Sequence, residues 1–183
     1  MYLRTVVLAL GLLLAMPPLA MVGPLEEGAA AYEHGDYATA MRVWRPLADK
    51  GNPLVQYGIG VMYKLAQGVP LDYGQAILWF KKAADQGYAD AQYQLGEMYL
   101  RAEGTTRDYA QAALWLQKAA DQGQADGQFL LGKMYSYGDG MPKDYDQARV
   151  WLQKAAEQGQ TEALYALGSM YRTGQGIPKD NTG

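Results

Sequence analysis

The sequence "DYAQAALWLQKAADQG", residues Asp108–Gly123, decides the fold because the chain repeats it with small changes. "DYGQAILWFKKAADQG" begins 36 residues earlier, at Asp72, and "DYDQARVWLQKAAEQG" begins 36 residues later, at Asp144. A constant period of this size is typical of repeat proteins, in which each repeat is one supersecondary unit. Further columns follow the same period: Gly51, Gly87, Gly123 and Gly159; Gly60, Gly96, Gly132 and Gly168; Tyr63, Tyr99, Tyr135 and Tyr171; Asp36, Asp72, Asp108, Asp144 and Asp180; Trp79, Trp115 and Trp151.

The quoted stretch predicts a helix from Asp108 to Gln122. The Asp108 carboxylate can accept hydrogen bonds from the free N–H groups of the first turn, and Gln111 can reach back to the cap. Gly123 ends the helix, because glycine adopts the left-handed conformation without strain. Apolar residues recur between these ends at three- and four-residue spacing and predict a buried stripe: Ala112, Trp115, Leu116, Ala119 and Ala120. We therefore expect the tryptophan column to be core.

A second helical pattern, "ADAQYQLGEMYLRA", precedes the first and covers Ala89–Ala102. Its expected buried side is Ala91, Leu95, Met98 and Tyr99, and Gly96 lets a partner helix approach closely. Loops such as "EGTTRD" and "DGMPKD" stop one helix with Gly or Pro and start the next with Asp. Each unit is thus a helical hairpin that must stack on its neighbours to bury its apolar stripe.

The words "ADAQYQLGEMY", "DYAQAALWLQKAADQG" and "GDGMPKD" resemble the Sel-1-like repeat family, a relative of the tetratricopeptide (TPR) repeats. The resemblance covers roughly residues 32–180. It implies an all-α fold, a right-handed α-α superhelix, or solenoid, of helical hairpins. It also implies a protein that binds other proteins, often in the envelope of Gram-negative bacteria.

The repeat pattern divides the chain into consecutive segments. They are an N-terminal segment over 1–23, a TPR-like hairpin over 24–52, full repeats over 53–88, 89–124 and 125–160, and a partial repeat over 161–180. The partial repeat predicts a lone first helix, Thr161 to Thr173. Its Leu164, Leu167 and Tyr171 then lack a second helix to pack under. A truncated product, a frayed last helix, or an open edge that docks a partner or a second copy all fit this pattern.

The first residues, "MYLRTVVLALGLLLAMPPLA", contain one cation, Arg4, and then an apolar stretch from Val6 to Met16. This order is typical of a secretory signal. The lack of charge from Thr5 to Leu25 keeps an uncleaved membrane anchor open. We expect a periplasmic or secreted protein of a Gram-negative bacterium, or one held at the inner membrane by this segment.

The composition excludes several classes of function. The net charge is −3 and no Lys or Arg run occurs, which argues against nucleic acid as a partner. Cysteine is absent, so no disulfide, thiolate metal site or Cys nucleophile exists. The single histidine and the scattered carboxylates give no metal site, and the glycines of the turns follow no strand. We therefore expect no metal and no cofactor.

Candidate catalytic residues are equally scarce. Serine occurs only as Ser136 and Ser169, and neither begins a Ser-x-x-Lys motif. Some cysteine-rich relatives of the family are described as penicillin-binding, but this chain lacks both features. We expect a non-catalytic adaptor. The alternatives are an enzyme acting on cell-wall or β-lactam substrates, by family analogy alone, and a scaffold that self-associates through the C-terminal edge.

The resemblance to TPR-like stacks places the first helix of each hairpin along a concave groove. Its fifth residues form an aromatic column, its ninth and twelfth residues vary, and together they are the predicted site for a protein or peptide partner: Tyr57, Tyr93, Phe129 and Tyr165; Val61, Glu97 and Lys133; Lys64 and Arg172. Aromatic residues bury a large area with few rotamers to freeze, which suits binding. The same rings could instead pack between adjacent hairpins, so both possibilities stay open.

Overall fold

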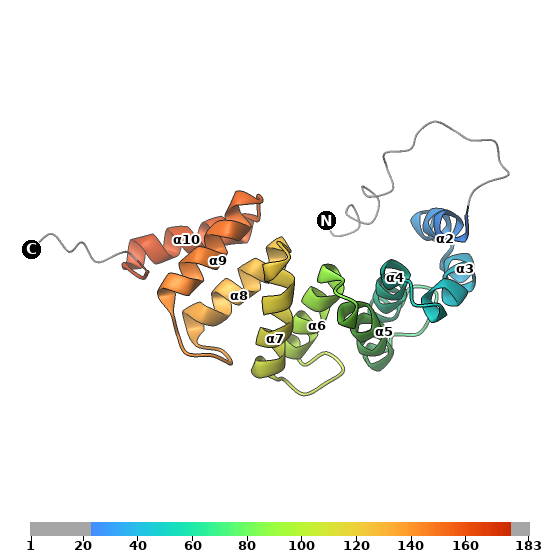
Figure 1. Ribbon diagram of the computed structural model, residues 1–183, viewed down its shortest axis with the longest axis horizontal. Coiled ribbons are helices and arrows are strands. Elements are labelled where there is room, and N and C mark those ends of the chain that lie inside the picture. The colour runs from blue at the N-terminus through green and yellow to red at the C-terminus, as the bar shows by residue number, and fades with distance from the viewer. Residues whose placement is uncertain (1–22, 177–183) are drawn as a thin grey trace, which may run out of the picture.

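A computed structural model describes residues 23–176, and this part of the chain is entirely helical apart from turns. The helices follow one another as α2 Pro24–Glu33, α3 Tyr37–Asp49, α4 Pro53–Lys64, α5 Tyr73–Asp85, α6 Ala89–Arg101, α7 Tyr109–Asp121, α8 Ala125–Tyr137, α9 Tyr145–Glu157 and α10 Thr161–Thr173. Each helix packs mainly against the helices before and after it in sequence. Together they form an arc of stacked hairpins (Figure 1), which confirms the predicted all-α superhelix.

Each second helix begins at its predicted aspartate. The Oδ1 atoms of Asp72, Asp108 and Asp144 each accept a hydrogen bond from the backbone N–H three residues later, at 2.9 Å. The predicted return contact from Gln111 is wrong. The N–H of Asp108 donates instead to the carbonyl of Tyr99, at 3.2 Å, and the neighbouring repeats make the same bond. The aspartate therefore both caps its own helix and ties it to the preceding one.

Glycine provides close approach within each hairpin, as predicted. A Cβ atom built on Gly96 would lie 2.5 Å from Cγ of Leu116, and one built on Gly132 would lie 2.8 Å from Cγ of Leu152. No real Cβ fits at these separations, so a larger residue would push the two helices apart. Gly123, after α7, has φ +86°, which confirms the left-handed end predicted for this helix.

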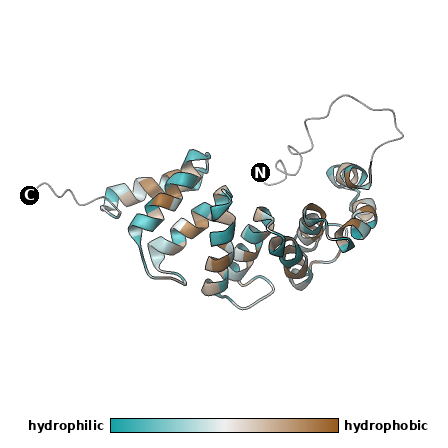
Figure 2. Cartoon of the chain, viewed as in Figure 1, coloured by the Kyte–Doolittle hydropathy of each residue, from teal (hydrophilic) through white to brown (hydrophobic). Residues whose placement is uncertain are grey.

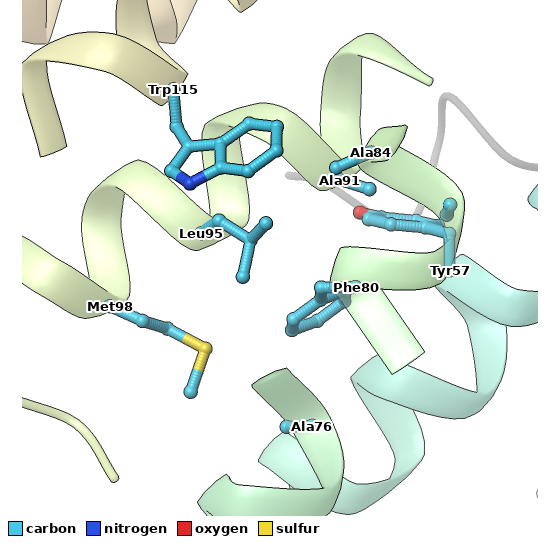
Figure 3. Packing of buried hydrophobic residues seen from close by; sticks show 9 residues of the cluster. Tyr57, Ala76, Phe80, Ala84, Ala91, Leu95, Met98 and Trp115 are labelled. Carbon is cyan, nitrogen blue, oxygen red and sulfur yellow. The ribbon is translucent and has the colours of Figure 1, made fainter. Parts of the chain in front are cut away.

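The apolar core consists of separate clusters between successive hairpins. The cluster in Figure 3 combines Tyr57 of α4, Phe80 of α5, Leu95 and Met98 of α6, and Trp115 of α7. Trp79 enters the preceding cluster and Trp151 the following one in the same way. Along the helices, apolar residues are interspersed with polar ones (Figure 2), which is the pattern of a helix that buries one face. Each tryptophan is thus core, as predicted, and joins its own hairpin to the one before.

A buried glutamine ladder was not anticipated from the sequence. Gln92 of α6 donates through Nε2 to the carbonyl of Ala84, at 3.1 Å, and accepts through Oε1 from Nε2 of Gln122, at 2.7 Å. Gln56 and Gln128 make the same pair of bonds one repeat earlier and later. Each glutamine adds a second hydrogen bond to a carbonyl near a helix end that already accepts one from the backbone N–H of the glycine after that helix.

Within residues 23–176, no later helix covers α10. Leu164 and Tyr171 are 56% and 55% exposed, and Gly168 has no neighbouring atom within 4 Å of its ideal Cβ position. Leu167 is partly buried against Leu152 and its neighbours in α9. Residues 1–22 of the signal or anchor predicted over 1–23, and the end of the partial repeat after Gly176, lie outside the described residues. Among the described helices, none has the length and apolarity needed to cross a membrane.

Candidate functional site

The inner side of the arc contains a cavity of about 390 Å³. Its wall is built from the first helix of every hairpin, α2, α4, α6, α8 and the start of α10, together with Trp44 of α3. Figure 1 shows these helices following one another around the arc. Because residues from both ends of the described chain share the cavity, it is a groove along the superhelix and not a gap between two neighbouring helices. We call it the inner groove.

The structure brings most of the predicted site residues to the inner groove. Those that line it are Tyr57, Val61, Lys64, Tyr93, Glu97 and Phe129. Those that do not are Lys133, Tyr165 and Arg172, which belong to the last two first helices. The predicted aromatic column is therefore uneven. Tyr57 and Tyr93 are only 7% and 5% exposed, Phe129 is half-buried, and Tyr165 is 76% exposed.

The two buried tyrosines combine the roles that the sequence analysis treated as alternatives. Tyr57 contacts the rings of Phe80 and Tyr88, with centroids 5.7 Å and 5.3 Å away, and belongs to the core cluster of its hairpin. Tyr93 belongs to the next cluster. Both still reach the groove wall. Their rings pack between hairpins and lie at the edge of the groove, with little exposed surface.

Helix geometry explains this edge position. Each residue turns an α-helix by about 100°, so the second, sixth, ninth and thirteenth residues of a first helix fall within about 60° of one another. The fifth and twelfth residues lie roughly 70–90° from the centre of that face. Most of the groove residues that the sequence analysis missed lie on this central face, and they are Asp126 and Glu162, Ala29, Gly58, Gln94 and Leu130, Tyr32, and Leu65 and Arg101. The spacing i, i+4, i+7 and i+11, counted from the second residue of each first helix, is the sequence signal that could have predicted these residues. The other missed residues lie elsewhere, and they are Glu33, Trp44 and Gln160.

A charged cluster crosses the middle of the groove and neutralises itself. Nζ of Lys64 lies 2.9 Å from Glu97 and 3.4 Å from Glu103, and it also donates to Gln94 at 2.9 Å. Arg101 contacts the other oxygen of Glu97 at 2.9 Å. Lys64 and Glu97 are mostly buried, so their attraction is screened less than that of surface pairs. Both groove-lining cations are therefore already paired with carboxylates of their own chain.

A line of acids follows the second position of successive first helices, at Asp90, Asp126 and Glu162. The amide of Gln124 donates to Asp90 at 3.5 Å, and the amide of Gln160 donates to Asp126 at 3.3 Å. Burial raises the pKa of Asp90, and the nearby Asp126 carboxylate raises it further, while the Gln124 hydrogen bond lowers it. Within residues 23–176, none of these acids forms an ion pair. The line is therefore a region of uncompensated negative charge.

The N-terminal end of the groove is aromatic. Tyr32 stacks on Trp44, with ring centroids 5.5 Å apart, and Tyr57, Val61 and Leu65 continue the wall. Burial is also the main cause that raises the pKa of Tyr57, and Asp90 raises it further; the same two causes raise the pKa of Tyr88 to about 12. These hydroxyls thus stay neutral at physiological pH and remain able to donate hydrogen bonds.

Reactive and metal-binding groups do not gather in the described part of the chain. No group of three His, Cys, Asp or Glu side chains there is arranged to hold a metal ion. Ser136 donates to the carbonyl of Gly132 in its own helix, at 3.0 Å, and Ser169 lies exposed on α10. The arrangement offers apolar walls, a few hydrogen-bonding groups and fixed charges, which are the elements of a binding surface.

The Sel1 repeat family model matches residues 53–88, 89–124, 125–160 and 161–182, which is more than half of the chain. The protein belongs to the Sel1 repeat family. This confirms the resemblance drawn from the sequence. Proteins of this family are generally non-catalytic helical scaffolds and commonly act as protein-interaction modules. No curated protein sequence matches the chain.

Solved structures agree with the family. A protective antigen of uropathogenic Escherichia coli strains, which displays an SLR fold, is 40% identical with a TM-score of 0.80. A Sel1 repeat protein from Oxalobacter formigenes is 34% identical with a TM-score of 0.79. The alignments cover 84% of this Sel1 repeat chain, but only 34% and 63% of those two proteins. The Helicobacter pylori cysteine-rich protein B shares the fold, with 18% identity and a TM-score of 0.54. That alignment covers 81% of this chain and 98% of the Helicobacter pylori protein.

Proposed function

We propose that this Sel1 repeat protein is an exported, non-catalytic adaptor that binds a peptide segment of a partner protein in the inner groove. The observation that carries the proposal is the cavity itself, which every first helix from α2 to α10 helps to line. A cavity of about 390 Å³ accommodates a few side chains, so it suits a peptide segment better than a folded domain.

The lining supports a peptide as the ligand. Tyr32 offers a large rigid ring, held by its stacking on the buried Trp44, and such rings are enriched at binding hot spots. Gln94, Gln160 and the charged side chains around them offer the hydrogen-bonding groups that an extended backbone requires. The buried core holds these side chains in place, so binding costs little conformational entropy.

Selection of peptides from a random displayed library, followed by calorimetry, tests the groove. Val61→Arg and Leu130→Arg place long cationic side chains on the groove wall and should weaken selected peptides at least tenfold. Leu114→Arg is the matched control, because Leu114 is 48% exposed on α7 and lines no part of the groove. Circular dichroism confirms that each variant is folded. Peptides that lose affinity only with Leu114→Arg would place the site on the second helices and reject the proposal.

Export is a separate part of the proposal. Its support is the sequence of residues 1–20, in which one arginine precedes an apolar stretch. Expression of the full chain in a Gram-negative host, with fractionation and intact mass, tests it. A periplasmic product shortened near residue 20 is expected. A full-length product in the cytosolic fraction would reject export and leave the groove proposal intact.

A further inference from the structure

The charges of the inner groove indicate what kind of peptide it selects. Six charged side chains line it, and they are Glu33, Lys64, Glu97, Arg101, Asp126 and Glu162. Lys64 and Arg101 are already paired with Glu97, and Lys64 also contacts Glu103. The acids left over are Glu33 near the aromatic end and Asp126 and Glu162 at the other end. Within the described residues, none of these three has a cationic partner.

The acids at the α8–α10 end are held in position. Gln160 accepts a hydrogen bond from the N–H of Ala163 through Oε1, at 2.7 Å, and its amide nitrogen donates to Oδ1 of Asp126, at 3.3 Å. Gln124 does the same one repeat earlier, between Gly127 and Asp90. One glutamine therefore caps its own helix and fixes the acid of the preceding hairpin. The second oxygen of Asp126 has no partner in the described chain.

Lys133 of α8 points to the ring of Phe129, with its Nζ 5.4 Å from the ring centroid. Lys133 is exposed and does not line the groove. The like charges along the acid line repel one another in the free protein, and Asp126 adds to the effect of burial, which is the main cause of the raised pKa of Asp90. A cation from a ligand relieves that repulsion, and an anion increases it.

Resting on the proposed function, we infer that the inner groove selects a peptide that combines an aromatic or aliphatic side chain with a lysine or arginine. The apolar side chain lies against Tyr32, Trp44 and Val61. The basic side chain pairs with Asp126 and Glu162. The half-buried Phe129 and Leu130 form the wall between these two ends and cover the stem of the basic side chain.

Fluorescence anisotropy with defined peptide pools tests the inference. The peptides are dodecapeptides with acetylated and amidated ends, and they carry Leu, Phe or Trp at fixed positions. The residues between these positions are Lys or Arg in the basic pool, Ser or Gln in the neutral pool, and Asp or Glu in the acidic pool. The basic pool should bind roughly tenfold more tightly than the neutral pool, and the acidic pool most weakly. The preference should shrink as salt is raised, because salt screens exposed charges.

Two variants separate this inference from the proposed function. Asp126→Asn combined with Glu162→Gln should remove the preference for the basic pool while the neutral pool keeps its affinity. Asp146→Asn combined with Glu157→Gln changes the charge of α9 equally, away from the groove lining, and should leave the preference intact. An unchanged preference in the Asp126 and Glu162 variant, or a preference for the acidic pool, would overturn the inference alone. Neutral-pool binding that survives Val61→Arg, or failure of every pool to bind, would reject the groove function as well.

Discussion

Helices α6 and α10 contain the same repeat pattern, yet their surroundings differ. Tyr93 of α6 is 5% exposed, whereas Tyr165 at the same repeat position of α10 is 76% exposed. The Cβ position of Gly96 lies 2.5 Å from Leu116, whereas that of Gly168 has no neighbour within 4 Å. The helix itself is equally regular in both places. The repeat sequence therefore encodes the helix, and the helices that follow it decide what the helix buries.

The core clusters show the same contrast. The clusters around α4, α6 and α8 each receive a tryptophan from the second helix of the same hairpin, namely Trp79 of α5, Trp115 of α7 and Trp151 of α9. The cluster under α10 contains Ala148, Leu152, Ala155, Ala163 and Met170, and no tryptophan enters it. Stability in a solenoid is close to a sum over repeats and their interfaces. The α9–α10 interface should therefore be weaker than the α5–α6 and α7–α8 interfaces.

Removal of one of these tryptophans is expected to have the largest effect. Trp115→Ala should lower the free energy of unfolding by about 3–5 kcal/mol, because it empties a large volume between two hairpins. Tyr165→Ala should change it by less than about 0.5 kcal/mol, because the ring is exposed. Urea unfolding followed by circular dichroism measures both. Equal effects of the two changes would remove the distinction between enclosed and open repeats.

The paired glycines are the next test. Gly96→Ala should destabilise by roughly 1–3 kcal/mol, because the added methyl group overlaps Leu116 and forces the helices apart. Gly168→Ala meets no atom and should stabilise by about 0.5–1 kcal/mol through better helix propensity. Thermal melts of the two variants measure these shifts. A loss of stability from Gly168→Ala would mean that α10 has a close neighbour in solution.

The ends of the first helices offer a smaller effect. Ala102 ends α6 with φ +59°, whereas Gly138 ends α8 and Gly174 ends α10 with similar positive angles. A Cβ atom makes this conformation costly, so Ala102→Gly should stabilise by roughly 1 kcal/mol or slightly less. Gly138→Ala should destabilise by a similar amount. Chemical denaturation of both variants gives the comparison, and two changes of the same sign would contradict it.

The smallest expected effect is on the pH dependence of stability, and it comes from Asp90 in the acid line. The pKa of Asp90 is raised in the folded protein, so its contribution to stability is greatest at low pH and is lost as pH rises through that pKa. Asp90→Asn keeps an acceptor for Gln124 and removes the charge. The variant should therefore gain stability over the wild type as pH rises from about 3 to 7. Unfolding curves across this range test it, and a constant or shrinking difference would contradict it.

The sequence by itself determined the helices and their ends. The period of 36 residues, the capping aspartates and the Gly-containing turns are local features of the sequence. They were therefore enough to predict α7 between Asp108 and Gln122. The stripe of alanine, leucine and tryptophan determined the buried side of each second helix for the same reason. Binary patterning is a property of one helix and needs no knowledge of its neighbours.

The residues that line the inner groove, and the way their charges combine, depend on how the hairpins stack. Tyr57 and Tyr165 share a repeat position, but one lies under the next hairpin and the other is open. The pairing of Lys64 with Glu97 and the glutamine ladder join residues that are 30 or more positions apart. Their energies depend on distance and burial across hairpins, which a periodic sequence does not specify. The hairpin stack sets both, and with them the uncompensated acids of the groove.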